Sequence, residues 1–502
     1  MPTPIETLIV IAVLLAAAPV FAAATEQYGI LTPAAPREPR INGPRVFGVR
    51  PGRPVLFTIP ATGARPITFA AQNLPAGLAL DGKTGRITGT IAKEGEYAVT
   101  LVATSACGKS ERPFKIVVGD RIALTPPMGW NSWNCWAQAV DEEKVRAAAD
   151  GMAASGLANH GWTYINIDDC WQGERRPPAY ALQPKGNFPD LKGLADYVHG
   201  LGLKVGIYST PWKTSYAGFA GGSADGDDGR ILEKGHAFGA VSFAAADARQ
   251  WAAWGLDYLK YDWKPNDVEH VGEMAAALRE CGRDIVYSLS NTAPPELAAR
   301  WAELANSWRT TGDITDTWES VSGIGFSQDR WRPFTGPGHW SDPDMLVVGR
   351  VGWGPSLRPS NLTPNEQYTH LSLWCLLAAP LLLGCDLENL DEFTLGLLTN
   401  DEVLEVDQDP LGRQAGRVAA DGPTQVWAKD MADGSKAVGL FNLDDSEPRA
   451  VTLRWSDLGL AGPHAVRDLW RQKDLGTFDG KFESRVLVHG VVMVRIARQP
   501  AN

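Results

Sequence analysis

Cysteine is scarce in this sequence. The 502 residues contain six cysteines, and no two of them form a Cys-x-x-Cys pair: Cys107, Cys135, Cys170, Cys281, Cys375 and Cys385. Disulfide-rich scaffolds need a denser set, and structural zinc sites usually draw on closely spaced cysteines. We therefore expect large hydrophobic cores to stabilise the fold, and we expect neither a bound metal nor another cofactor.

Basic clusters are also missing. The chain has no run of Lys or Arg, its net charge is -11 at pH 7 and its pI is about 5.3. Such a surface repels a polyanion, so nucleic acid is excluded as a partner and a neutral or cationic one is favoured. The 19 tryptophans are many for this length. Most indoles pack in cores, but their faces also suit the C–H faces of sugars.

The N-terminus combines an apolar segment with a lack of basic residues. Residues 8–24, LIVIAVLLAAAPVFAAA, end in small residues, as a secretory signal peptide does before its cleavage site. The preceding MPTPIE has no Lys or Arg, which leaves an uncleaved membrane anchor as the alternative. Residues 1–24 thus predict a secreted or periplasmic protein, with no stable membrane insertion after cleavage.

The rest of the chain changes its pattern three times. Residues 25–45 are rich in Pro and are predicted to be a linker. Residues 46–119 contain short β-type runs between turn residues, and their LPAGLALDGKTGRITGT is similar to immunoglobulin-like modules of secreted bacterial enzymes. Residues 121–412 alternate short apolar runs with segments of helical period. Residues 413–502 return to alternating β runs.

These patterns predict a multidomain protein. The strand and helix units of residues 121–412 number about eight, which favours a (β/α)8 TIM barrel as the catalytic domain. We expect an N-terminal Ig-like β-sandwich and a C-terminal antiparallel β-sandwich to flank it. Because such barrels carry their chemistry at the C-terminal ends of the strands, the side chains that follow each predicted strand are the candidates for a site.

Carboxylates, aromatic residues and cations gather at these strand ends. They are Trp130 and Trp133 in MGWNSW, Asp168 and Asp169 in YINIDDCW, Tyr208 in VGIYS, Lys260 and Asp262 in YLKYDW, Arg309 and Asp313 in SWRTTGD, and Asp342 and Asp344 in HWSDPDM. Singly, each Asp could be a helix cap, a turn residue or a cation ligand. Together they indicate a polyol site, because carboxylates accept hydroxyl hydrogen bonds, cations donate them and indoles wall a sugar face.

Two of these residues can perform chemistry. Cleavage of a glycosidic bond needs two carboxyl groups, and Asp262 and Asp313 can supply them. Lys260 lies two residues before Asp262 and is expected to lower the pKa of Asp262 and keep it ionised. Asp313 would need a raised pKa to hold its proton until transfer.

Seven motifs, in this order along the chain, resemble the family 27 glycoside hydrolases, the α-galactosidase and α-N-acetylgalactosaminidase family: LTPPMGWNSWN, YINIDDCW, LKVGIY, WGLDYLKYD, WRTTGD, WSDPDML and VDQDPLG. The resemblance implies a retaining, exo-acting enzyme that removes terminal α-linked galactose from an oligosaccharide or polysaccharide. Asp262 would be the nucleophile and Asp313 the acid and then the base. The implied substrate-binding residues are Trp133, Asp168, Asp169, Tyr208, Lys260, Ser290, Arg309, Asp344 and Met345.

The sequence departs from the family pattern after the fifth predicted strand. Ser290 stands where α-galactosidases of the family carry a Glu that contacts the 2-hydroxyl, and Ala293 follows three residues later. Small residues at these positions resemble the α-N-acetylgalactosaminidases, which leaves that activity as an alternative. A β-L-arabinopyranosidase is disfavoured by Asp169, the implied partner of the 6-hydroxyl. A non-catalytic carbohydrate-binding protein is disfavoured by the two carboxyl groups.

A second departure concerns disulfides. Many relatives support the nucleophile loop with a disulfide, but Tyr216 and Lys264 occupy the matching positions here. That disulfide cannot form. A disulfide between Cys135 and Cys170 is an open alternative, which an exported protein could form, although Cys135 is displaced from the site usual in the family.

Overall fold

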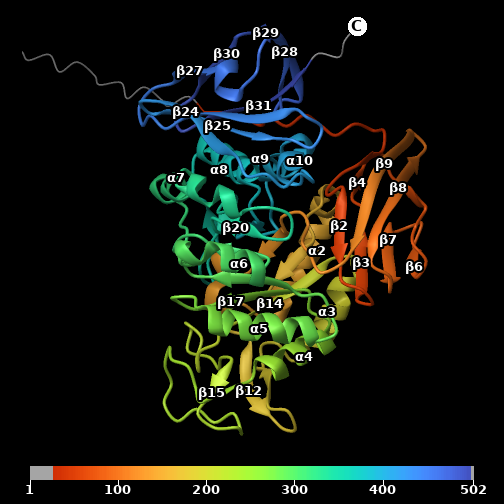
Figure 1. Ribbon diagram of the computed structural model, residues 1–502, viewed down its shortest axis with the longest axis vertical. Helices are drawn as coiled ribbons and strands as arrows, with labels where there is room; N and C mark the ends of the chain where they lie inside the picture. The colour runs from red at the N-terminus through yellow and green to blue at the C-terminus, as the bar shows by residue number, and fades with distance from the viewer. Residues whose placement is uncertain (1–26, 499–502) are drawn as a thin grey trace, which may run out of the picture.

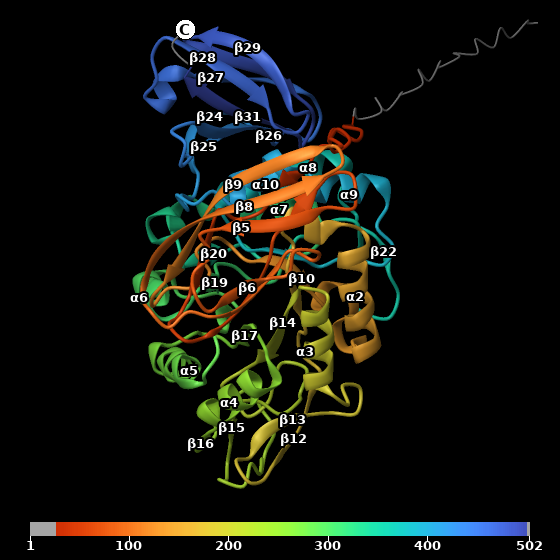
Figure 2. The same cartoon turned by 90° about the vertical axis from the view of Figure 1, so that its right-hand side faces the viewer.

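The computed structural model describes residues 27–498, so the predicted signal peptide, 1–24, lies outside the described residues. The chain forms a central barrel, a C-terminal β-sandwich at one end of it and an N-terminal β-sandwich against its side (Figures 1 and 2). This arrangement confirms the predicted fold class. Within residues 27–498, no helix combines the length and the apolar character that crossing a membrane requires.

Eight parallel strands form the barrel sheet, in the spatial order β20-β19-β18-β17-β14-β11-β10-β23. A parallel bridge between Leu346, just beyond β20, and Leu383 of β23 joins the two edges. The strands are short and mostly buried, as expected for a sheet covered on both faces. They are β10 (Met128–Asn131), β11 (Tyr164–Asn166), β14 (Lys204–Ser209), β17 (Tyr258–Asp262), β18 (Val286–Ser290), β19 (Ser307–Arg309), β20 (Trp340–Asp342) and β23 (Leu381–Leu383).

A helix follows each of these strands. Asp141, Asp190 and Asp267 begin three of the helices by accepting a hydrogen bond from a first-turn amide, and Thr363 and Glu366 form a capping box at a fourth. The α-helices are α1 (Trp133–Trp136), α2 (Glu142–Ala154), α3 (Leu191–Gly200), α4 (Ala244–Trp254), α5 (Val268–Glu280), α6 (Ala298–Leu304), α7 (Trp318–Gly325), α8 (Pro364–Leu377), α9 (Glu392–Leu398) and α10 (Asp401–Asp407). The short 3-10 helices are η1 (Ala137–Ala139), η2 (Leu157–His160), η3 (Pro295–Leu297), η4 (Gln328–Phe334) and η5 (Trp455–Leu458).

Three β-hairpins extend the loops of the barrel. They are β12 (Gln172–Arg176) with β13 (Ala181–Pro184), β15 (Ser223–Ala224) with β16 (Val241–Ser242), and β21 (Arg350–Val351) with β22 (Arg358–Pro359). The first two follow β11 and β14, and they lie at the end of the molecule farthest from the C-terminal sandwich (Figures 1 and 2). They therefore belong to the face where the C-terminal ends of the strands open.

The N-terminal sandwich packs a four-stranded sheet, β2-β9-β8-β5, against a three-stranded sheet, β3-β7-β6, with a separate pair of β1 and β4. Its core includes Ile87, Phe114 and Ile116. Strand β1 lies inside the segment predicted to be a linker, so the folded module begins before residue 46. The strands are β1 (Arg40–Ile41), β2 (Val46–Val49), β3 (Pro54–Thr58), β4 (Ala61–Thr62), β5 (Thr68–Gln72), β6 (Leu78–Leu80), β7 (Arg86–Thr90), β8 (Gly95–Ser105) and β9 (Gly108–Val118).

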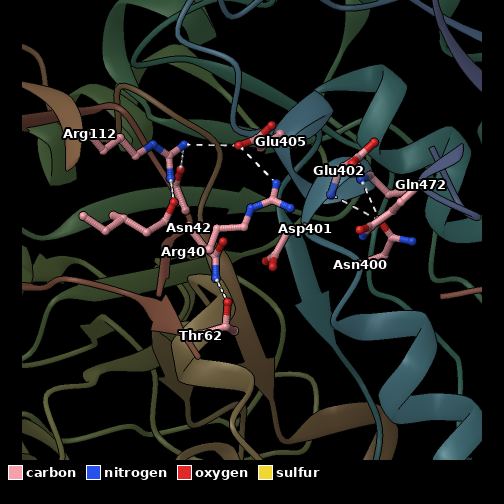
Figure 3. A network of polar contacts seen from close by, with 12 residues as sticks. Arg40, Asn42, Thr62, Arg112, Asn400, Asp401, Glu402, Glu405 and Gln472 are labelled. Atoms are coloured by element: carbon pink, nitrogen blue, oxygen red, sulfur yellow. Dashed lines mark hydrogen bonds and ion pairs between the residues drawn. The ribbon is translucent and has the colours of Figure 1, made fainter. Parts of the chain in front are cut away.

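Polar contacts fix this module to the barrel. Arg40 and Arg112 reach the same carboxylate oxygen of Glu405 in α10, at 3.5 and 3.7 Å (Figure 3). At another point of the junction Arg50 pairs with Asp284 at 3.1 Å. The module is thus held at several places rather than tethered by a flexible segment.

The C-terminal sandwich has a six-stranded sheet, β24-β25-β26-β31-β28-β29, and a two-stranded sheet, β27-β30. Strand β26 packs on α8 of the barrel, and Lys429 of β25 donates a hydrogen bond to the carbonyl of Val406 at 2.7 Å. The strands are β24 (Gly416–Asp421), β25 (Thr424–Asp430), β26 (Lys436–Asn442), β27 (Arg449–Arg454), β28 (Pro463–Asp468), β29 (Lys473–Asp479), β30 (Lys481–Val486) and β31 (Val491–Arg498).

Cys135 and Cys170, whose pairing the sequence left open, are both free thiols. The two thiols face different neighbours. After burial, the thiol of Cys385 is the main group that raises the pKa of Cys135, whereas burial and Asp169 raise the pKa of Cys170 to about 12. Of the two alternatives that the sequence left open, the structure therefore has the unbridged one.

Candidate active site

A cavity of about 210 Å³ opens at the C-terminal ends of the barrel strands. Ten of the eleven site residues predicted from the sequence line it: Trp133, Asp168, Asp169, Tyr208, Lys260, Asp262, Arg309, Asp313, Asp344 and Met345. They come from six of the eight strands or from the segments directly after them. Because the barrel brings all strand ends to one face, residues separated by more than 200 positions meet there.

Asp262 lies deep in the cavity. It is the last residue of β17, and its side chain is buried. Oδ1 of Asp262 accepts a hydrogen bond from Nδ2 of Asn291 at 2.8 Å. Lys260 lies two residues earlier on the same strand, and alternation along a strand places both side chains on one face. The strand therefore delivers a carboxylate and an ammonium group to the same cavity.

Lys260 forms an ion pair with Asp168. Its Nζ lies 2.7 Å from Oδ2 of Asp168, and both side chains are largely buried. Burial alone would lower the pKa of Lys260, but the charges of Asp168 and Asp262 raise it above its usual value. Lys260 is therefore a fixed cation next to the deepest carboxylates.

Asp169 is held by the backbone and by one side chain. Its Oδ1 accepts hydrogen bonds from the Cys170 amide at 2.7 Å and from Gln172 Nε2 at 2.9 Å. Its Oδ2 accepts one from the Ala217 amide at 3.0 Å. Three donors fix this carboxylate and leave lone-pair capacity on Oδ2 for a further donor.

Arg309 ties together two carboxylates on the other side of the cavity. Its Nη2 lies 2.8 Å from Oδ2 of Asp344 and 3.1 Å from Oδ1 of Asp313. Asp344 is buried and also accepts a hydrogen bond from the Ile314 amide at 2.8 Å. The Asp313 side chain is 66% exposed. Asp313 thus marks the mouth of the cavity, and Asp262 marks its interior.

The pKa values of Asp262 and Asp313 are shifted in the directions opposite to those expected from the sequence. Burial raises the pKa of Asp262 to about 6; Lys260 opposes this shift, while Asp168 and Asp313 add to it. Burial would also raise the pKa of Asp313, but Arg309 and Lys260 hold it below its usual value. The expectation that Lys260 lowers the pKa of Asp262 overlooked the loss of hydration and the second carboxylate that Lys260 already pairs with.

The remaining predicted residues form the walls. Trp133 begins the short helix α1 after β10, and Met345 follows Asp344 after β20. Tyr208 of β14 stands level with Lys260 of β17 in the sheet register. Burial and then the charge of Asp262 raise the pKa of the Tyr208 hydroxyl well above its usual value, so it stays protonated. The cavity therefore offers an indole, a thioether and a phenol beside its charged groups.

Ser290 is the predicted residue that does not line the cavity. It ends β18, its hydroxyl is buried, and within residues 27–498 that hydroxyl has no hydrogen-bond partner. Ala293 is also fully buried and lies outside the lining. The residue of this loop that lines the cavity is Asn291 instead.

Five lining residues were not predicted as site residues: Asn134, Tyr216, Lys264, Asn291 and Trp353. Tyr216 and Lys264 carried a signal, because they are the two positions at which the sequence departs from the disulfide that the resemblance implied. Tyr216 is braced by His236, whose ring lies 5.1 Å away and stacks on Trp212 at 5.0 Å. Trp353 has a φ of +51°, a left-handed backbone conformation that is unusual for a bulky residue, and no sequence pattern predicted it as a site residue.

No metal centre accompanies these residues in the part of the chain that the structure describes. Among residues 27–498, no three His, Cys, Asp or Glu side chains are grouped so that they could hold an ion. Lys260 and Arg309 also place positive charge among the carboxylates, which disfavours cation binding in the cavity.

Comparisons with known proteins match all three units. A family model described as "Alpha galactosidase A" matches residues 125–409, one described as "Alpha galactosidase C-terminal beta sandwich domain" matches 421–496, and one described as "Putative Ig domain" matches 38–119. A "Probable alpha-galactosidase" of Dictyostelium discoideum is 36% identical over 418 residues, which cover 81% of this chain and 100% of that relative.

Solved structures show the same architecture. The crystal structure of a "putative alpha-galactosidase" from Bacteroides fragilis matches with a TM-score of 0.82 and 34% identity, covering 92% of this chain and 98% of that one. A β-L-arabinopyranosidase from Geobacillus stearothermophilus matches with a TM-score of 0.67 and 32% identity, covering 76% of this chain and 98% of that one.

Proposed function

This chain belongs to the alpha galactosidase A family of glycoside hydrolases, and we propose that it is a retaining, exo-acting enzyme that removes terminal α-linked galactose from oligosaccharides or polysaccharides. The observation that carries the proposal is the pair of acids at two depths of one cavity. Asp262 is buried inside, and Asp313 is exposed at the mouth. A sugar placed between them meets one acid at its anomeric carbon and the other at its leaving oxygen.

In the first step, an oxygen of ionised Asp262 attacks the anomeric carbon and forms a covalent bond to it. The bond from that carbon to the leaving oxygen breaks, and protonated Asp313 gives its proton to that oxygen. The freed alcohol departs through the mouth, where Asp313 lies. The sugar remains as an ester of Asp262 with inverted configuration.

In the second step, water takes the place of the departed alcohol. Ionised Asp313 accepts a proton from the water, the water oxygen bonds to the anomeric carbon, and the bond to Asp262 breaks. A second inversion restores the α configuration. Asp262 leaves as a carboxylate and Asp313 ends protonated, so the enzyme returns to its starting state.

The remaining lining residues support a sugar with several hydroxyl groups. We assign Asp168, paired with Lys260, to the axial 4-hydroxyl, and Asp169, fixed by three donors, to the 6-hydroxyl. Lys260, next to Asp168, donates to a neighbouring hydroxyl, and Arg309 donates from the other side of the cavity. A cavity of only about 210 Å³ suits a single sugar at the end of a chain, which supports exo action.

The structure bears on the alternative sugars through two loops. Room for a 2-acetamido group was expected at Ser290 and Ala293, but both residues are buried outside the cavity lining. We therefore place N-acetylgalactosamine second to galactose as the sugar that the enzyme removes. Asp169 faces the cavity where a 6-hydroxyl would bind, which ranks β-L-arabinopyranose, a sugar without that group, third. We also propose that the enzyme acts outside the cytoplasm; that proposal depends on residues 1–24 alone.

A panel of aryl glycosides tests this function. We expect wild-type protein to cleave the aryl α-galactoside with a higher kcat/KM than the α-N-acetylgalactosaminide or the β-L-arabinopyranoside, and NMR should detect the α anomer of the sugar first. Asp262→Ala should lower kcat/KM by about 10³-fold or more while leaving the melting temperature near that of wild type. Added azide should rescue this variant and yield the β-galactosyl azide, because a single inversion replaces two. Normal turnover by Asp262→Ala would refute the mechanism.

A further inference from the structure

Asn291 stands out among the lining residues because it contacts a reacting group. Its side-chain amide donates to Oδ1 of Asp262 at 2.8 Å, and it lines the cavity beside that carboxylate. The small residues near it, Ser290 and Ala293, do not line the cavity. The segment after β18 therefore reaches the site through one side chain.

The backbone of this segment is fixed in the shape that delivers Asn291. The carbonyl of Ser290 accepts a hydrogen bond from Asn266 Nδ2 at 3.2 Å, and the amide of Ala293 donates to the carbonyl of Arg309 at 2.8 Å. Between these anchors Asn291 has a φ of +59° and Thr292 a φ of +24°. Asn tolerates the left-handed region, but a β-branched residue there is strained. Such strain needs support from its surroundings, and it often accompanies a functional geometry.

We propose that Asn291 is a positioning residue for Asp262, holding Oδ1 so that Oδ2 is the oxygen that attacks the anomeric carbon. This inference rests on the proposed function. In the first step the Asn291 amide fixes the direction of the free lone pair of Oδ2. In the second step it donates to the same carboxylate as the bond to the sugar breaks and negative charge returns to Asp262.

The amide also acts on the ionisation of Asp262. A hydrogen bond donated to a carboxylate favours its charged form, and here it opposes the burial that holds the pKa of Asp262 at about 6. Loss of the donor should therefore raise that pKa further. The variants retain the other titratable groups that face Asp262, which are Asp168, Tyr208, Tyr216, Lys260, Arg309 and Asp313.

Two glycine variants of the same loop isolate the side chain of Asn291. Asn291→Gly keeps the positive φ accessible and removes the donor, whereas Thr292→Gly makes the same change at the next residue, which is exposed and does not line the cavity. The probe is an aryl α-galactoside with a strongly acidic phenol as its leaving group. Such a phenol departs without a proton from Asp313, so the dependence of kcat/KM on pH reports Asp262 alone.

For wild type and Thr292→Gly, kcat/KM should rise with pH through about 6 and reach the same plateau. For Asn291→Gly, the plateau should be about 10- to 100-fold lower and the rise should shift upward by about one pH unit, since hydrogen bonds to charged groups have this strength. Asn291→Asp keeps the shape of the residue and its tolerance of positive φ, but it places a carboxylate against Asp262. It should shift the rise further, and it decides the question if Asn291→Gly does not fold.

Coincident pH profiles for the Asn291 variants and Thr292→Gly would overturn the positioning role, whether or not the plateau fell, because a purely structural role leaves the profile in place. Failure of the proposed function looks different. In that case wild-type protein itself would not cleave the aryl α-galactoside. The two hypotheses are thus separated by the first measurement.

Discussion

For the carboxyl group of Asp262, loss of hydration outweighs the attraction of a nearby cation. Lys260 lies on the same strand, but its ammonium group forms an ion pair with Asp168 at 2.7 Å. Burial therefore prevails and raises the pKa of Asp262 to about 6. Asp313 keeps two-thirds of its side chain in contact with solvent and pairs with Arg309, so its pKa falls. Burial therefore decides the shift of the Asp262 pKa, whereas the charges of Arg309 and Lys260 decide that of Asp313.

These shifts predict the pH dependence of a natural galactoside, which needs both acids. The productive enzyme carries one proton on the pair, with Asp262 ionised and Asp313 protonated. Below the lowered pKa of Asp313, which lies under 3.8, both acids hold protons, and above about 6 neither does. We therefore expect kcat/KM to peak between these limits and to fall as the pH rises through about 6.

Initial rates measured from pH 3 to pH 8 check this prediction. The two limbs give the pKa values of the pair and do not assign them to one residue or the other. With the acidic phenol leaving group, wild type and Asp313→Asn should both lack the falling limb and show a rise governed by Asp262. A wild-type maximum above pH 7 would contradict the expected ionisation.

The strands of the barrel depend on small residues where they approach one another. A methyl group added at Gly206 of β14 would lie 2.8 Å from Cβ of Tyr258 on β17 and would also overlap the side-chain amide oxygen of Asn166 on β11. Neither neighbouring strand can retreat without disturbing the strand beyond it. The position is therefore reserved for glycine by packing.

We expect Gly206→Ala to destabilise the protein by about 1–3 kcal/mol through overpacking. Gly272 of α5 supplies the control, because a methyl group there meets nothing within 4 Å. Gly272→Ala should stabilise the protein by about 0.5–1 kcal/mol through helix propensity. Thermal melts of both variants check the prediction, and equal melting temperatures would contradict it.

Loops that follow the strands decide which groups reach the cavity. The loop after β14 is ordered by an ion pair of Lys213 with Asp225 at 3.2 Å and by the stacking of His236, and it presents Tyr216. The loop after β18 presents Asn291 where the sequence had suggested Ser290. At the scale of elements, the strands set where the chemistry occurs, and the loops set its selectivity.

At the scale of the whole molecule, one carboxylate at the junction between the N-terminal module and the barrel forms ion pairs with several arginines. Arg40, Arg45 and Arg112 all lie within 3.7 Å of the same oxygen of Glu405. Arg112 is buried, and it also donates to the carbonyls of Ile41 and Gly43 at 2.7 and 2.8 Å. Burial and then Arg45 lower the pKa of Arg112 to about 10, against the opposing effect of Glu405. Removing that carboxylate leaves like charges facing one another.

Glu405→Gln should therefore destabilise the protein by about 1–3 kcal/mol and lower its melting temperature by roughly 2–4 °C. Its kcat/KM should not change, because α10 lies outside the cavity. Glu447→Gln is the control. Glu447 is exposed and its ion pair with Arg449 is long, at 3.8 Å, so this contact should contribute less than about 1 kcal/mol to stability. Differential scanning calorimetry distinguishes the two, and an unchanged melting profile for Glu405→Gln would show that the junction does not depend on this carboxylate.

The order of elements could be predicted because periodicity is a local property. The apolar runs in LKVGIY and DYLKY correspond to β14 and β17, and the helical segments that precede them correspond to α3 and α4. The C-terminal ends of the predicted strands carry Asp168, Asp262 and Arg309, and all three line the cavity. The end of a strand can be predicted from the sequence, and the barrel then brings all the C-terminal strand ends together on one face.

The sequence by itself determined the three-unit architecture and the residue types available to the site, since hydrophobic period and motif spacing are written along the chain. Tertiary structure alone decided that Cys135 and Cys170 are free thiols and that Asn291 and Trp353, but not Ser290, line the cavity. It also decided that burial raises the pKa of Asp262 and that Arg309 and Lys260 lower the pKa of Asp313. The reason is physical. Hydration, charge and backbone strain depend on distances between residues far apart in the chain, and those distances exist only after folding.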